Sequence, residues 1–358
     1  MPSKAVCGKI KYCMDTKIAV ENEKPPRIYQ AIVKGFNTIA NHAYLLILPF
    51  LLDIFLWLGP KLSISDTLNS FISLMEKSFQ QQIAQPGMEQ QLSQFQLVQP
   101  AMEQFANSFN LFGFLTTTPI GVPSLLAFPG VLDTPFGMSN IVVMNSITQE
   151  FLLMVAMLVI GSFLGAIYIA EIGRCTNLNQ ELHQFSFSRL FQNVGWLVLL
   201  NFALWIAVIL IILPSAAMTV LAGLLNEFVG NILYFIILLV LFWIFIPLIF
   251  TPHGIVIQQQ NPLKAMLASM RLIRYYLPGT GFFIMFSLLI YQIMNQFLWL
   301  LPKTSSYMLL GGIFGHAFIS TGLIASSFMY YQDGLRWMNH NLKMIAQQSN
   351  QTSRPFQA

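Results

Sequence analysis

The chain has 358 residues, of which 55% are hydrophobic and only 9% are charged. Because about a quarter of the residues in a soluble protein are charged, this composition excludes an ordinary water-soluble domain and indicates helices that cross a membrane. The net charge of +4 does not imply a nucleic-acid partner, since the uneven placement of the cations accounts for it.

Six apolar stretches are long enough to span a bilayer, which takes roughly 20 residues. They lie near 42–59, 149–171, 191–213, 231–251, 279–301 and 309–331. We therefore expect an all-α membrane protein with six transmembrane helices in three hairpins. The expected divisions are a basic tail with a first interfacial helix at 1–41, a transmembrane domain at 42–331 and a tail at 332–358. An insertion at 60–148 interrupts the transmembrane domain.

The basic residues predict the orientation of these spans. If the N-terminus is cytoplasmic, the outer segments contain only Lys61, Lys77 and Lys303, and the other fifteen of the 18 Lys and Arg residues lie inside. Because cationic loops resist translocation, we expect a bacterial inner-membrane protein with both termini cytoplasmic. No apolar run precedes residue 43, so we expect no cleaved signal peptide.

A short amphipathic helix is expected before each hairpin, at 26–36, 185–191 and 261–274. In the third, Asn261 can cap the helix and Pro262 suits its first turn. Such helices lie in the membrane interface with their apolar side in lipid and their cations near headgroup phosphates. The cations expected to contact lipid headgroups are Arg27, Lys34, Arg189, Lys264, Arg271 and Arg274.

The expected outer segment 60–148 is too long for a simple connector. Apolar stripes predict amphipathic helices near 68–83 and 92–109, lying on the outer leaflet or packed over the spans. Pro100 can kink or break the second helix. The stretch 111–140, rich in Gly, Pro and Thr, is interpreted as an irregular cap that is partly inserted in the membrane. Two interpretations stay open: a functional element, or a cover without a ligand.

Polar side chains within the spans are costly and are candidates for function. At 1.5 Å per residue, Asp53 and His316 lie at a similar depth below the expected outer boundary, roughly 10 Å. Amides of the fifth span lie close to that depth, so the candidate polar layer comprises Asp53, Gln292, Asn295, Gln296 and His316. One hypothesis is an outward-facing polar cavity. The alternative, which we favour, is a hydrogen-bond network that holds the helices together.

Other residues suggest packing or solvent contact. Gly161 with Gly165, and Gly311 with Gly315, have the small-xxx-small spacing of closely packed membrane helices. His253, after the fourth span, is interpreted as a solvated side chain in a turn. Asp333 and Arg336 are three residues apart and can form a local ion pair. No clustered His and Cys ligands predict a metal site.

Two local strings resemble a group of bacterial membrane proteins. Thr251–Met266 leads into a helix with an Ala-Leu-x-x-Ser-x-x-Leu-like pattern at 265–272, and Phe328–Arg336 resembles that group's Tyr-x-Asp-Leu-Arg-like closing motif. The group comprises uncharacterised six-span integral membrane proteins related to the membrane domain of some glycerophosphodiester phosphodiesterases. The resemblance covers spans three to six, and the long segment 60–148 departs from it. This chain has no phosphodiesterase catalytic domain, so that activity does not carry over.

No catalytic motif is found in the sequence. We therefore expect a non-enzymatic membrane protein without a cofactor, acting as a scaffold, assembly factor or accessory subunit. Its expected partners are membrane lipids, other membrane proteins or further copies of itself, and no nucleic acid. The alternative is a transporter or lipid-handling permease with an outward-facing polar cavity.

Overall fold

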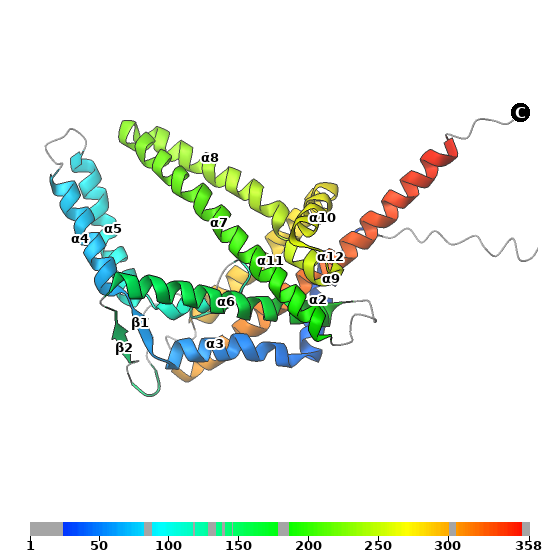
Figure 1. Cartoon of the computed structure of the whole chain (residues 1–358), viewed down its shortest axis with the longest axis horizontal. Helices are drawn as coiled ribbons and strands as arrows, with labels where there is room; N and C mark the ends of the chain where they lie inside the picture. Colours follow the sequence, from blue (N-terminus) through cyan, green and yellow to red (C-terminus); the bar gives the residue numbers. More distant parts are fainter. Residues whose placement is uncertain are drawn as a thin grey trace, which may run out of the picture.

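The computed structural model describes residues 24–81, 88–116, 119–127, 134–137, 140–144, 146–177, 186–300 and 306–352. These residues contain five helices long and apolar enough to cross a membrane, or six if one bent pair is counted as a single span. The protein is thus helical and of the multi-pass membrane type. Figure 1 shows the long helices running through the molecule and the C-terminal helix extending beyond them.

The helices follow one another along almost the whole described chain (Figure 1). Those before the long spans are α2 (Ile28–Asn41), η1 (Ala43–Leu46), α3 (Ile47–Leu58), α4 (Ser65–Gln81), α5 (Met88–Ser108) and η2 (Leu111–Thr116). They are followed by α6 (Ile147–Thr176), α7 (Phe187–Leu225), α8 (Glu227–Phe245), η4 (Ile246–Leu248), α9 (Thr251–Gln258), α10 (Pro262–Tyr275), α11 (Leu277–Leu300) and α12 (Ser306–Thr352). Two short parallel strands, β1 (Lys61–Ser63) and β2 (Ile141–Val143), pair with Lys61 opposite Ile141.

The first predicted span is one part of a bent pair, in which α2 meets η1 and α3 at 92°. The chain leaves the helical conformation at His42, whose Nδ1 lies 2.9 Å from the Thr38 carbonyl oxygen. That contact satisfies a carbonyl that the ending helix leaves without a backbone donor. With 12 residues, α3 is only about 18 Å long, which is less than the hydrocarbon thickness of a bilayer.

The helix α2 packs along α12, so the expectation that its apolar side lies in lipid is wrong. Its buried residues are Ala31, Gly35 and Ile39. A Cβ atom at Gly35 would lie only 2.4 Å from the backbone nitrogen of Ser326 in α12. Small residues on both helices let the two backbones come this close, and the face of α2 that they form is therefore covered by protein.

The other two expected amphipathic helices differ from each other. In the second, residues 187–191 are not a separate helix, because α7 runs continuously for 39 residues from Phe187 and its first half contains no proline to end it. The third, α10, is separate, and the predicted cap is confirmed: Asn261 Oδ1 accepts a hydrogen bond of 3.0 Å from the Lys264 amide. Ser269 then ties α10 to η4, since its hydroxyl donates to the Pro247 carbonyl.

Segment 60–148 contains the two predicted helices, α4 and α5, which form a hairpin that projects from the ends of the long helices (Figure 1). Their apolar stripes face each other, with the Phe79 and Phe95 rings 5.3 Å apart, and Pro100 is accommodated inside α5. At the base of the hairpin, burial lowers the pKa of Lys61 in β1. Beyond the hairpin, η2 and residues 119–127 join the main core.

The described part of the predicted tail 332–358 is helical, because α12 continues to Thr352. Of the predicted tail 1–41, residues 1–23 lie outside the described residues. The main core joins α3, α6, α7, α9 and α12 with η2 and residues 119–127 of the long segment.

Candidate functional site

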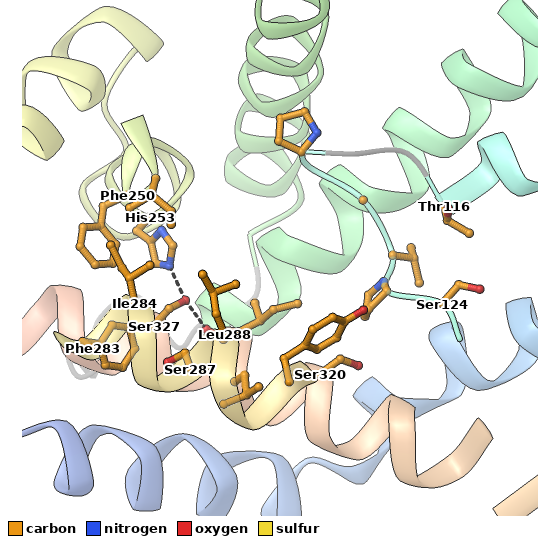
Figure 2. Close-up of a pocket in the computed structure, with 18 of the residues that line it drawn as sticks. Thr116, Ser124, Phe250, His253, Phe283, Ile284, Ser287, Leu288, Ser320 and Ser327 are labelled. Atoms are coloured by element: carbon orange, nitrogen blue, oxygen red, sulfur yellow. Dashed lines mark hydrogen bonds between the residues drawn. The ribbon is translucent and has the colours of Figure 1, made fainter. Parts of the chain in front are cut away.

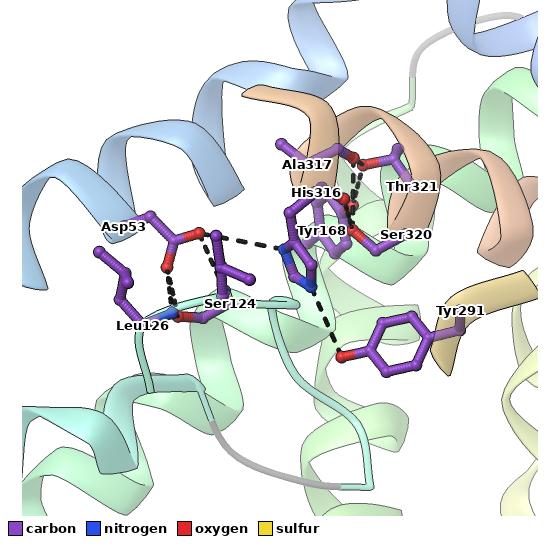
Figure 3. Close-up of polar contacts among 10 residues, drawn as sticks. Asp53, Ser124, Leu126, Tyr168, Tyr291, His316, Ala317, Ser320 and Thr321 are labelled. Carbon is purple, nitrogen blue, oxygen red and sulfur yellow. Dashed lines mark hydrogen bonds and ion pairs between the residues drawn. The ribbon is translucent and has the colours of Figure 1, made fainter. Parts of the chain in front are cut away.

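Asp53 is fully buried on α3 and holds the irregular segment 119–127 in place. Its carboxyl group accepts hydrogen bonds from the Ser124 hydroxyl and from two backbone amides, those of Leu125 at 3.0 Å and Leu126 at 3.2 Å (Figure 3). Backbone amides that are buried away from water need an acceptor. Asp53 supplies one where no helix or sheet does.

His316 on α12 lies beside Asp53 and is also buried. Its Nδ1 is 4.0 Å from Asp53 Oδ2, and its Nε2 is 3.5 Å from the hydroxyl of Tyr291 on α11 (Figure 3). One helical turn further along α12, Thr321 Oγ1 lies 2.7 Å from the hydroxyl of Tyr168 on α6. His316 thus connects α12 with α3 and α11, and Thr321 connects α12 with α6.

The predicted small-residue spacing in α6 accommodates the irregular segment and not another span. A Cβ atom at Gly161 would lie 2.6 Å from the Leu115 carbonyl oxygen, and one at Gly165 would lie 2.5 Å from Gly121 Cα. In α12, Gly315 faces the Leu298 side chain, whereas nothing lies within 4 Å of a Cβ built at Gly311. The α6 glycines therefore make room for the chain that Asp53 holds.

A cavity of about 670 Å³ lies between α9, α11, α12, Thr116 and the segment 119–127 (Figure 2). Its wall is largely apolar, with Phe250, Ile284 and Leu288 among the residues that line it. The same wall includes Ser124 and Tyr291, which contact Asp53 and His316 respectively. The cavity and the buried polar contacts therefore form one continuous site.

His253 lines this cavity, and the expectation that it is solvated is wrong. It is 7% exposed, lies inside α9, and its Nε2 is 2.7 Å from Ser327 Oγ on α12. The apolar residues after it make α9 almost entirely buried.

A sequence signal for this site does exist: Ser320 and Ser327 are seven residues apart and therefore share one face of α12.

The structure brings together two of the five residues of the predicted polar layer, Asp53 and His316. Gln292 and Gln296 are exposed on α11, while Asn295 is half-buried and its Oδ1 has no hydrogen-bond partner. Among the described residues, none of these three amides lines the cavity or hydrogen-bonds to Asp53 or His316.

The predicted headgroup contacts fall into two sets. Arg27 and Lys34 line a pocket of about 510 Å³ together with Asp333 and Arg336. Asp333 pairs with Lys34 at 2.9 Å and with Arg336, which confirms the predicted ion pair. The remaining cations are exposed on α7 and α10: Arg189, Lys264, Arg271 and Arg274.

The residues that the structure describes contain no group of three or more His, Cys, Asp or Glu side chains placed to hold a metal ion. The chain matches no family model, no curated protein and no solved structure. The resemblance to the six-span bacterial proteins therefore stays a prediction, and the function has to be argued from the site itself.

Proposed function

We propose that this chain is a non-enzymatic bacterial plasma-membrane protein that binds a lipid-like molecule in the cavity between α9, α11, α12 and segment 119–127. The cavity itself is the observation that supports this function. The cavity is open on one side, where the lining residue Leu288 is 61% exposed. Its volume of about 670 Å³ lies within the range of ligand pockets, about 300–1,000 Å³.

The wall of the cavity favours an apolar ligand that has few polar atoms. Aromatic and aliphatic side chains make most of the surface, and a few polar groups, such as Ser287, Ser320 and Ser327, interrupt it. That composition is typical of sites in which apolar contact supplies affinity and isolated hydrogen bonds orient the ligand. Asp53 supports the function indirectly, since it fixes the segment that forms one wall.

Ser287→Phe tests this proposal, because the larger ring would fill the cavity. The Ser287 hydroxyl is buried without a hydrogen-bond partner, so its removal breaks no hydrogen bond within the protein. The matched control is Met285→Phe, a position on the same helix that is 58% exposed.

The measurement is the amount of membrane lipid that stays with each purified protein in mild detergent, by mass spectrometry. We expect the wild type and Met285→Phe to retain the same lipid and Ser287→Phe to lose it. Equal lipid in all three proteins would contradict the proposal.

A second candidate, the scaffold or accessory subunit, is favoured by the α7–α8 hairpin, which diverges from the other helices (Figure 1). None of the most apolar 18-residue window of α8 is buried. Its large side chains, such as Phe235, are therefore free to face lipid or a second membrane protein. A photo-crosslinking residue at Phe235 should capture one stoichiometric partner under this candidate, and only lipid under the first.

The proposed topology puts both termini in the cytoplasm, three hairpins in the membrane, and the α4–α5 hairpin outside. It is supported by the distribution of the cations, of which only Lys61, Lys77 and Lys303 fall in the expected outer segments. In this topology the pocket beside Arg27 and Arg336 faces the phosphates of the inner leaflet. A protease site inserted at 82–87 should be cut from the outer side of the membrane, and cleavage from the cytoplasm only would contradict the orientation.

A further inference from the structure

The charge of the cavity wall restricts the ligand. None of the described residues that line the cavity is Lys, Arg, Asp or Glu. A phosphate, carboxylate or ammonium group inside it would lose its hydration without gaining an opposite charge, and that burial is unfavourable. The part of the ligand that enters the cavity is therefore uncharged.

The hydrogen bonds of the wall show which of its polar atoms already have a partner within the protein. The Ser327 hydroxyl donates its only proton to the Ile324 carbonyl oxygen at 2.6 Å. It must therefore accept the 2.7 Å hydrogen bond from His253 Nε2, so that Nε2 carries the imidazole hydrogen. In the neutral ring the other nitrogen, Nδ1, is then an acceptor, and it is buried without a partner.

The other hydroxyl groups of the wall differ in whether they already make a hydrogen bond within the protein. Ser320 donates to the His316 carbonyl oxygen, and Ser124 donates to Asp53. Ser287 makes no hydrogen bond, although its Oγ is buried. Leaving such a group without a partner is unfavourable, and a ligand that bonds to it would remove that penalty.

His253 and Ser287 lie at the same end of the cavity, where Figure 2 shows them on either side of Ser327. Phe250, Phe283 and Ile284 surround this end. Since the His253 ring is turned with Nε2 toward Ser327, Ser287 is the group of this end left for a ligand. Its hydroxyl can both donate and accept, and an uncharged hydroxyl of a ligand matches it, since that group also donates and accepts.

We propose that the ligand is a single-chain amphiphile with an uncharged hydroxyl group, such as a long-chain alcohol or a monoacylglycerol. The hydroxyl lies against Ser287, and the chain extends along the apolar wall toward Ser124. This inference rests on the proposed lipid-binding function and adds the class of the ligand.

The test compares three probes that share an eighteen-carbon chain: oleyl alcohol, oleate and 1-octadecene. Each is added to the intact protein in mild detergent, and the bound amount is measured by mass spectrometry after gel filtration. We expect the alcohol to bind best. Ser287→Ala should weaken binding of the alcohol about threefold to tenfold, the ratio expected for one hydrogen bond, and leave octadecene binding unchanged.

Two further variants keep the test independent of folding. Ser287→Cys retains the size of the side chain with a weaker donor, and should weaken alcohol binding less than Ser287→Ala does. Met285→Ala, on the exposed side of α11, should bind all three probes as the wild type does.

The outcomes separate this inference from the function on which it rests. If octadecene binds as well as the alcohol, or if oleate binds better, the hydroxyl class is wrong while a lipid-binding cavity stands. If none of the three probes binds, both proposals fail.

Discussion

The spans formed by α8 with the short helices after it, Phe228–Gln258, and by α12, Tyr307–Gln347, are both apolar enough to cross a membrane, yet their most apolar windows differ in burial. No residue of that window is buried in the first span, whereas 56% of the window is buried in α12. The buried helix is the one that carries the polar side chains, among them His316, Thr321 and Ser326. In a membrane, therefore, a strongly apolar helix is free to face lipid, and polar or small residues mark the helix that packs inside.

The physical reason is that lipid is as apolar as a leucine side chain, so burying α8 would gain little. Helix α12 gains close contact and hydrogen bonds instead. Its hydroxyl groups return bonds to its own carbonyls, as Ser326 does to Gly322, and its small residues admit α2. These differences lead to four predictions, from the largest expected effect to the smallest.

The largest effect is expected from a matched pair of aromatic truncations. Phe328→Ala in α12 removes a fully buried ring that stacks near His253 and should destabilise the protein by about 3–5 kcal/mol. Phe235→Ala in α8 changes a side chain that is 70% exposed and should change stability by about 0.5 kcal/mol or less. Unfolding in lipid nanodiscs measures both, and similar losses would show that α8 is covered by protein.

The close crossing of α2 and α12 predicts the next effect. Gly35→Leu would place a side chain 2.4 Å from the Ser326 backbone nitrogen and should destabilise the protein by about 3 kcal/mol. The control is Gly311→Leu in α12, where nothing lies within 4 Å of the added Cβ. The midpoint of thermal unfolding in mild detergent should fall only for Gly35→Leu. Because Leu favours the helical conformation more than Gly does, an equal fall for both variants would mean that the contact with Ser326 does not set the cost.

Gly165→Leu in α6 should displace the segment that forms one wall of the cavity, because the new side chain would overlap Gly121. The expected cost is about 2 kcal/mol. Val122→Cys, at a position that is 1% exposed, reports the displacement as faster maleimide labelling when the native cysteines are replaced by serine. Gly195→Leu in α7, with no atom within 4 Å, should leave labelling slow. Slow labelling in both would contradict the contact.

Asp53→Asn should have the smallest of these effects, about 1–2 kcal/mol, because one oxygen that accepts from the segment is replaced by an NH₂ group. Labelling of Val122→Cys should rise less than it does for Gly165→Leu. Asp66→Asn, at an exposed residue of α4, is the control. If Ser124→Ala is added, the loss should be smaller than the sum of the single losses, since both residues share one hydrogen bond. Additive losses would argue against that bond.

Part of this architecture could be predicted from local patterns alone. The apolar stretches predict the long helices, the stripes near 68–83 and 92–109 predict α4 and α5, and Asn261 with Pro262 predicts the start of α10. Each of these signals depends on residues within a few turns of one another, which is why the sequence carries them.

Only the tertiary structure decides which residues meet across the molecule. Asp53 and His316 are predicted at one depth, but the amides beside Asp53 come from Leu125 and Leu126, in a segment without any periodic pattern. His253 has a local context typical of a turn, and its burial depends on α12, more than seventy residues later. Depth and helix type are local properties, whereas hydrogen-bond partners and cavities arise from packing between distant segments, and no local spacing encodes that packing.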